Sequence, residues 1–209
     1  MLILLLAKIG GSVKLLTIAI TGAPGAGKSS ACRLFKELGS FVVSADDLVH
    51  KLLENNLDVI HRVSQLLGDK VKKDGKLDRN AIAEKVFSDT HKLLQLEKIL
   101  YPHVQKEMKK YYDQAKNDDY PLFIAEVPLL FEAGFEKLFD QVILVTADES
   151  ICKMRWNDDK KSSSDYDRRK SRFMAEDKKI NQSNYIIKNN QGFAELKAQV
   201  HQLFDKLTH

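Results

Sequence analysis

The stretch from Leu15 to Phe35, LLTIAITGAPGAGKSSACRLF, restricts the possible folds more than any other part of the chain. Residues 15–21 form a short apolar run rich in β-branched side chains and closed by a glycine, which predicts a buried strand. Residues 29–39 place apolar side chains at helical spacing and end in glycine, which predicts a helix. The sequence therefore predicts a strand and a helix joined by a glycine-rich turn.

The turn has the spacing of a phosphate-binding loop, Gly-x4-Gly-Lys-Ser. Glycines let successive backbone N–H groups point inward at phosphate oxygens, and the following helix adds the positive end of its dipole. Lys28 is predicted to reach the β- and γ-phosphates, and the Ser29 hydroxyl to coordinate Mg²⁺. The residues predicted to bind ATP here are Gly22, Gly25, Ala26, Gly27, Lys28, Ser29 and Ser30. The alternative is an ordinary tight turn; a chance match to the pattern is roughly 1% at average residue usage.

Further apolar runs alternate with helical patterns along the chain. Strands are predicted at 40–45, 120–127, 139–147 and 185–189. Helical patterns cover about 48–115, with an exposed turn at 68–79, then 149–180 and 193–207. Buried strands that alternate with helices predict an α/β fold with a parallel sheet and crossover connections. We expect one domain over residues 15–207, with a helical insert at about 48–115 and a charged lid at about 153–180.

Composition and charge indicate which kind of molecule the protein binds. The 209 residues fit one domain, and 44% hydrophobic with 30% charged residues is ordinary for a soluble globular protein. The net charge of +4 is concentrated in the C-terminal quarter, where no aromatic-rich basic motif accompanies it, so we expect a nucleotide rather than a nucleic acid as partner. Two distant cysteines are expected to be reduced thiols in the cytoplasm, and none of the six histidines has metal-ligand spacing.

The first residues, MLILLLAKIGGSVK, carry an apolar run that is too short to span a membrane and lacks the basic start of a secretory signal. We expect residues 1–14 to be an extension that precedes the domain. No membrane partner is expected.

Two acidic positions are candidates for chemistry. The second predicted strand runs into Ser44-Ala45-Asp46-Asp47, which places carboxylates at the carboxyl edge of the sheet, where open α/β sheets bind ligands. Asp46 is predicted to accept the proton of a substrate hydroxyl. The alternative, a helix N-cap, is assigned to Asp47. Glu126 closes another buried strand and is predicted to hold Mg²⁺ through water, the alternative being a buried structural carboxylate.

Arginines of the charged segment are candidates for a clamp on the transferring phosphoryl group. They are Arg155, Arg168, Arg169 and Arg172. A solvated charged helix is the alternative interpretation. A GTPase is excluded because no Asn-Lys-x-Asp motif occurs, and a mechanical ATPase is usually longer.

Taken together, these residues resemble the dephospho-CoA kinase family from Leu15 to about Leu207. The motifs that carry the resemblance are TGAPGAGKSS (21–30), SAD (44–46), LDR (77–79), VF (86–87), L-x-P-x-V (100–104), VPLLFE (127–132) and YIIKNNQG (185–192). After the glycine loop, VPLLFE is the most diagnostic of them.

The resemblance implies ATP-dependent phosphorylation of the ribose 3′-hydroxyl of dephospho-CoA, the last step of coenzyme A synthesis. It also implies a P-loop core, a helical CoA-binding region and a lid. Asp46 matches the family's proposed base, residues 25–30 match its ATP loop, and Asn189 falls in the stretch near the adenine. Arg155 is the residue that approximates the family's lid motif.

The chain departs from the family pattern in several places. Ser44 replaces an aspartate, Tyr101 a histidine and His50 an arginine, and the family's Arg-x3-Arg-Asp pattern in the lid is approximated only by Arg155. Two other hypotheses remain at this level. One is another small-molecule or nucleoside monophosphate kinase with the same loop, which would not need VPLLFE together with LDR. The other is a nucleotide-binding regulator without catalysis, which would not need a carboxylate at Asp46.

Overall fold

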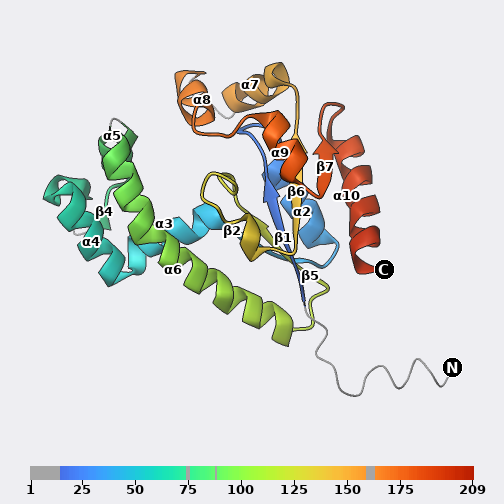
Figure 1. Ribbon diagram of the computed structural model, residues 1–209, viewed down its shortest axis with the longest axis horizontal. Coiled ribbons are helices and arrows are strands. Elements are labelled where there is room, and N and C mark those ends of the chain that lie inside the picture. The colour runs from blue at the N-terminus through green and yellow to red at the C-terminus, as the bar shows by residue number, and fades with distance from the viewer. Residues whose placement is uncertain (1–14, 74–75, 88, 159–162) are drawn as a thin grey trace.

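The predicted α/β fold is confirmed by a computed structural model, which describes residues 15–73, 76–87, 89–158 and 163–209. Five parallel strands form one sheet in the order β2-β5-β1-β6-β7 (Figure 1). Their bounds are β1 Leu16–Thr21, β2 Phe41–Ser44, β5 Leu122–Glu126, β6 Gln141–Thr146 and β7 Tyr185–Lys188. The extension predicted for residues 1–14 lies outside the described residues.

Helices lie in the connections between the strands, and a last helix, α10, follows β7. They are α2 Lys28–Glu37, α3 Ala45–Asn55, α4 Leu57–Leu67, α5 Arg79–Phe87, α6 Thr90–Asn117, α7 Glu149–Asp158, α8 Ser163–Lys170, α9 Glu176–Gln182 and α10 Phe193–Thr208. Two short 3₁₀ helices, η1 Asp69–Val71 and η2 Glu136–Leu138, lie in the connections. Part of the exposed turn expected at 68–79 is instead a small antiparallel pair, β3 Lys72–Lys73 and β4 Lys76–Leu77.

The three central strands are buried on both faces. Successive side chains of a strand point to opposite sides, so each strand contributes to two hydrophobic clusters. Along β1, Ile18 and Ile20 join one hydrophobic cluster, and Ala19 joins another on the opposite face. Along β5, Ile124 and Phe123 divide in the same way. Helices therefore have to cover both faces of the sheet, as the near-continuous apolar runs predicted.

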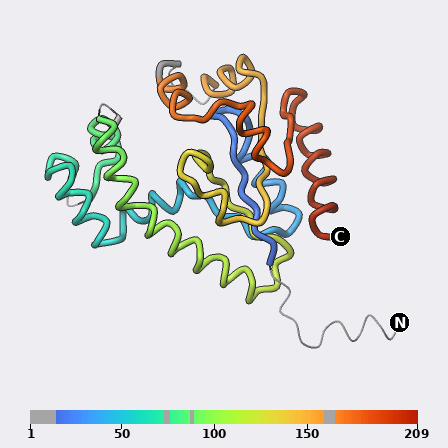
Figure 2. Tube along the Cα trace, viewed as in Figure 1, coloured from blue at the N-terminus to red at the C-terminus, as the bar shows by residue number. Residues whose placement is uncertain are grey.

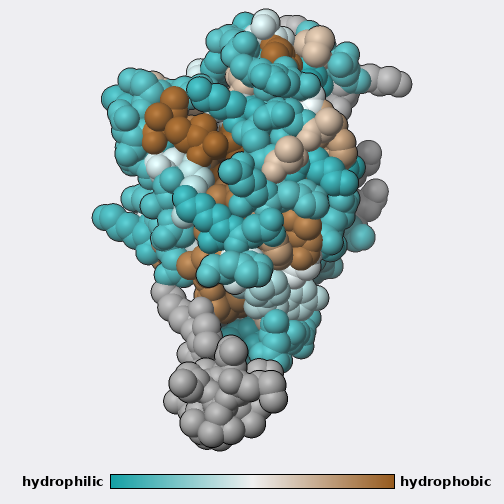
Figure 3. Space-filling view, turned by 90° about the vertical axis from the view of Figure 1, so that its right-hand side faces the viewer, coloured by the Kyte–Doolittle hydropathy of each residue, from teal (hydrophilic) through white to brown (hydrophobic). Residues whose placement is uncertain are grey.

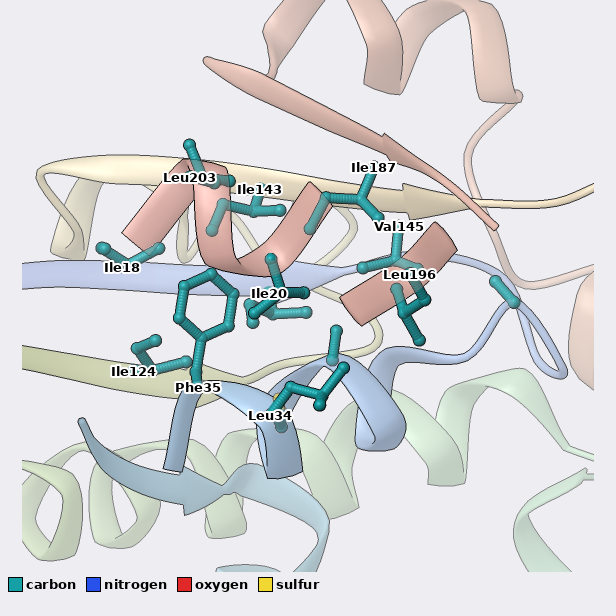
Figure 4. Close-up of a cluster of buried hydrophobic side chains, with 14 of the residues drawn as sticks. Ile18, Ile20, Leu34, Phe35, Ile124, Ile143, Val145, Ile187, Leu196 and Leu203 are labelled. Atoms are coloured by element: carbon teal, nitrogen blue, oxygen red, sulfur yellow. The ribbon is translucent and has the colours of Figure 1, made fainter. Parts of the chain in front are cut away.

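One face is covered by α2 and α10. Phe35 and Leu34 of α2 and Leu196 of α10 pack against Ile20 and Ile143 of the sheet (Figure 4). The opposite face is covered by the C-terminal half of α6, where Ala115 and Tyr112 meet Phe123. The core is thus a sheet between two helical layers.

The insert that follows β2 is an arm of helices with a core of its own. Helices α3, α4 and α5 and the N-terminal half of α6 enclose Leu52, Val63, Val86 and Leu96, among other buried residues. Figure 2 shows this arm standing beside the sheet, with the long α6 running from the arm back to the core. The arm and the sheet are therefore tied by α6 and by the start of α3.

The side that carries α10 is mostly hydrophilic, with hydrophobic side chains in separate patches (Figure 3). Ile186 of β7 and Phe193 at the start of α10 are among the exposed apolar residues. Within the described ranges, no helix combines the length and apolar character needed to span a bilayer.

Phe35 offers a test of this packing. Its side chain is fully buried between α2 and the sheet. Phe35→Ala is expected to lower the free energy of unfolding by about 3–5 kcal/mol, because it leaves a cavity in the main core. Urea denaturation measures the loss, with Leu57→Ala as control. Leu57 is 82% exposed, so its removal is expected to cost less than about 0.5 kcal/mol. A similar cost for the two variants would contradict the packing described here.

Candidate active site

The glycine loop between β1 and α2 has a backbone that only glycine adopts readily. Gly25 and Gly27 have φ of +75° and +101°. A Cβ on Gly27 would lie 2.1 Å from Asn189 Nδ2, and one on Gly25 would lie 2.3 Å from the Cys152 carbonyl oxygen. Both glycines are therefore required by φ and by close approach of neighbouring segments.

Asn189 supports the loop from beneath. Its side-chain Nδ2 donates to the Ala26 carbonyl at 2.9 Å, and its backbone N–H donates to the Thr146 carbonyl at 2.8 Å. Asn189 is 4% exposed. Asn189, Gly22 and Ala26 do not belong to the cavity wall described below. The contact of Asn189 with the adenine, expected from the sequence, stays a prediction.

Helix α2 begins at Lys28, one residue earlier than predicted, with Gly27 as N-cap and no side chain capping it. The first N–H groups of a helix have no intrahelical partner, so this end can receive an anion. Lys28 Nζ donates to the Ala23 carbonyl at 3.0 Å. Burial lowers the pKa of Lys28, while the nearby Glu126 and Asp46 charges raise it.

The two residues predicted to hold Mg²⁺ meet in the structure. Ser29 Oγ donates to Glu126 Oε1 at 2.9 Å. Glu126 ends β5 and is in register with both Ile20 of β1 and Ser44 of β2. Burial raises its pKa, and the hydrogen bond from Ser29 and the charge of Lys28 act in the opposite direction. A hydroxyl and a carboxylate beside a phosphate-binding loop form an oxygen donor set, which suits Mg²⁺.

The prediction that Asp47 caps the next helix is wrong. Ser44 is the N-cap of α3, and its side chain accepts the backbone N–H of Asp47 at 3.2 Å. Asp46 and Asp47 both lie in the first turn, where a carboxylate interacts favourably with the positive end of the helix dipole. Ser44, one of the residues that depart from the family pattern, therefore caps the helix, and Asp46 lines the cavity without serving as the cap.

A cavity of about 910 Å³ opens over the loop. The loop and the start of α2, the end of β5 with the residues after it, and the start of α3 line one side. They contribute Pro24, Gly25, Gly27, Lys28, Ser29, Ser30, Glu126, Pro128, Leu129 and Asp46. The arm contributes His50 and Arg79, and the segment from α7 to the residues after α8 contributes Arg155, Trp156, Asp158, Arg169, Arg172 and Phe173. The loop, the arm and the charged segment at 155–173 thus face a common space.

Arg155, one of the predicted clamp residues, lies on the cavity wall. Its Nη2 donates to the Asn189 carbonyl at 3.0 Å, while its Nη1 is buried and has no hydrogen-bond partner among the described residues. An orphaned guanidinium N–H on the wall of this cavity is suited to an anion.

The other three arginines of the charged segment differ in their position relative to the cavity. Arg169 and Arg172 line the cavity, whereas Arg168 is outside its wall and pairs with Asp165. Arg169 also lies over the Trp156 ring, 5.5 Å from its centroid.

Sequence reasoning gave no site role to His50, Arg79 or Trp156. Arg79 Nη1 donates to His50 Nδ1 at 3.2 Å, and both residues line the arm side of the cavity. The LDR motif that contains Arg79 was a signal for this residue. For Trp156, the only sequence signal was its position next to Arg155.

The fold and the site together define a P-loop kinase: a parallel sheet whose central strand runs into a phosphate-binding loop, with Lys28, Asp46 and Glu126 around one cavity. The family model described as dephospho-CoA kinase (CoaE) matches residues 16–195. The chain belongs to the dephospho-CoA kinase family.

Individual relatives agree with this. The dephospho-CoA kinase of Chlamydia pneumoniae is 43% identical over 194 residues, which cover 92% of this chain and 96% of that protein. The dephospho-CoA kinase of Protochlamydia amoebophila is 39% identical over 198 residues, covering 93% and 98%. The crystal structure of TT1252 from Thermus thermophilus covers 94% of this chain and 100% of its own, with a TM-score of 0.81 at 27% identity. The dephospho-CoA kinase from Campylobacter jejuni, at 22% identity and a TM-score of 0.63, covers 94% and 99% and shows the same fold.

Glu126 yields a prediction about pH. Because burial raises its pKa, the native protein binds more protons than the unfolded chain between the two pKa values. Its contribution to the free energy of unfolding therefore falls as the pH rises through that window, and the ionised group lowers stability at pH 7. Glu126→Gln is expected to be at least as stable as the unsubstituted protein at pH 7, with the advantage shrinking toward pH 4. Urea denaturation across this range measures it.

Glu149→Gln provides the control of opposite sign. Hydrogen bonds from Lys170 and Lys153 lower the pKa of Glu149, so its charge adds stability above its unfolded pKa, and that stability is lost as the pH falls. A Glu126→Gln protein that is less stable than the unsubstituted one at pH 7 would contradict the sign derived for Glu126.

Proposed function

We propose that this protein transfers the γ-phosphoryl group of ATP to the ribose 3′-hydroxyl of dephospho-CoA, giving coenzyme A and ADP. The observation that carries the proposal is the convergence of Lys28, Asp46, Glu126 and Arg155 on one cavity beside the glycine loop, in a chain of this family. A cytoplasmic location is part of the proposal, supported by two free, buried cysteines.

The loop and its surroundings bind the triphosphate. The free N–H groups at the start of α2 and the Lys28 ammonium face the β- and γ-phosphates, and Lys28 leaves the Ala23 carbonyl to do so. Arg155 directs its unpartnered Nη1 at the same charge. Ser29 and Glu126 are the residues that would hold Mg²⁺, which when bound neutralises charge on the phosphates.

Asp46 acts as the general base for the acceptor hydroxyl. As the bond from the 3′-oxygen to the γ-phosphorus forms and the bond from that phosphorus to the bridging oxygen breaks, the hydroxyl proton passes to the Asp46 carboxylate and ADP leaves with the bond electrons. Much of the rate comes from positioning, because the transition state is loose. Arg79 and His50 on the arm side supply a donor surface for the phosphates of dephospho-CoA.

A coupled ADP-release assay with dephospho-CoA, AMP and pantetheine tests the proposal. Turnover is expected with dephospho-CoA and not with the other two. Preference for AMP would support a nucleoside monophosphate kinase, and binding of ATP without turnover on any acceptor would support a regulator. Lys28→Ala is the matched negative, since loss of one transition-state donor costs about 10²–10³-fold. More than about a tenth of the original kcat in that variant would contradict the role of the loop.

Asp46→Asn tests the base. The substitution keeps size and leaves the Ser44 cap of α3 in place, so helix formation is expected to be unchanged. Turnover is expected to fall by about 10²–10³-fold, the low end for a general base, because deprotonation is late in this reaction. The KM for ATP should change little. Asp47→Asn, one residue along, is the control, and near-normal kcat in Asp46→Asn would transfer the role of base to Glu126.

A further inference from the structure

The diagnostic VPLLFE segment ends in Glu132, a residue that does not line the cavity. Its carboxylate lies in the interior and faces another charge that the proposed mechanism does not use. Glu132 Oε1 is 2.7 Å from Lys179 Nζ of α9, and the two side chains are only 16% and 3% exposed. A lysine of this burial is rare unless its charge is paired.

The same carboxylate oxygen binds the backbone of the lid. Glu132 Oε1 accepts the Met174 N–H at 2.6 Å, whereas Oε2 is buried and has no hydrogen-bond partner among the described residues. Compensation for this buried carboxylate therefore runs through Oε1. Met174 lies in the short connection between α8 and α9, where no regular secondary structure fixes the chain.

This connection carries two residues of the cavity wall. Arg172 and Phe173 directly precede Met174 and both line the cavity. Lys179 Nζ also lies over the Phe173 ring, 4.5 Å from its centroid, which is cation–π distance. Arg172 forms an ion pair with a different helix: its Nη2 lies 2.6 Å from Glu97 Oε1 of α6. Glu132 thus fixes the point from which these two side chains enter the site.

We infer that Glu132, through the Met174 N–H and Lys179, is the positioning residue that holds Arg172 and Phe173 against the bound substrates. The inference rests on the proposed function, because the reaction that these residues serve is the proposed phosphoryl transfer. A displacement of about 1 Å at a reacting site can cost about 10²-fold in rate, so a tether outside the cavity can set turnover.

A matched pair of double variants isolates the tether. In a Lys179→Met background, Glu132→Gln and Glu132→Ala both remove the buried charge pair, so neither leaves an uncompensated charge inside. Only the Gln variant keeps an oxygen that accepts the Met174 N–H. We expect kcat of the Ala variant to be about 10-fold or more below that of the Gln variant, with both compared at a temperature where thermal unfolding shows them folded. Asp113→Asn, in an exposed pair on α6, is the control for loss of a carboxylate and should leave kcat unchanged.

Adding Arg172→Ala to both double variants separates positioning from general stabilisation. If Glu132 acts through Arg172, the difference in kcat between the Gln and Ala variants should largely disappear in this background, while their difference in stability persists. Equal kcat in the two double variants, or a kinetic difference that remains when Arg172→Ala and Phe173→Ala are both added, would overturn the inference.

Trp156 gives a readout that does not depend on turnover. It is the one tryptophan in the sequence and lines the same cavity. Its emission should respond to a non-hydrolysable ATP analogue in the Gln variant and respond less in the Ala variant; identical responses would count against the inference. If the unsubstituted protein fails to phosphorylate dephospho-CoA, the proposed function fails, and this fluorescence comparison still tests Glu132.

Discussion

The parallel pairing of β1 with β5 on one side and β6 on the other is the constraint on which the site depends. Parallel strands end at the same edge, so this pairing brings the glycine loop, Glu126 and the start of α3 together. The register matters as much as the order. A slip of one residue in β5 would turn Glu126 toward the opposite face of the sheet and bring a neighbouring side chain to its place beside Ser29.

The geometry also sets an electrostatic cost. Burial lowers the pKa of Lys28 and raises that of Glu126, so each charge is less favourable here than in water. The two groups attract each other, which offsets part of the cost. Arg155 Nη1 adds a donor without a partner among the described residues. The site is therefore arranged for charges that ligands bring, and this arrangement lowers the stability of the free protein.

The strand, glycine turn and helix at the start of the domain could be predicted because the signals are local: spacing, glycine conformation and the helix that follows are all visible in a short stretch of sequence. The α/β fold followed from apolar runs that are buried on both faces. Capping of α3 was assigned to Asp47 although Ser44 does it, since both residue types favour that position. The roles of Asn189 beneath the loop and of Glu132 against Lys179 depend on contacts between segments far apart in the chain, which no local pattern encodes.

The strand order also has a consequence for the way the chain is synthesised. Leu16 pairs with Leu122 and Ile18 with Gln141, so the central strand emerges from the ribosome long before either neighbour exists. The arm, in contrast, encloses its own core from residues that follow one another closely. Contacts between nearby residues form faster than distant ones. During translation the arm is therefore expected to fold first, while β1 and its glycine loop fold only after the second half of the chain, with β5 and β6, has been synthesised.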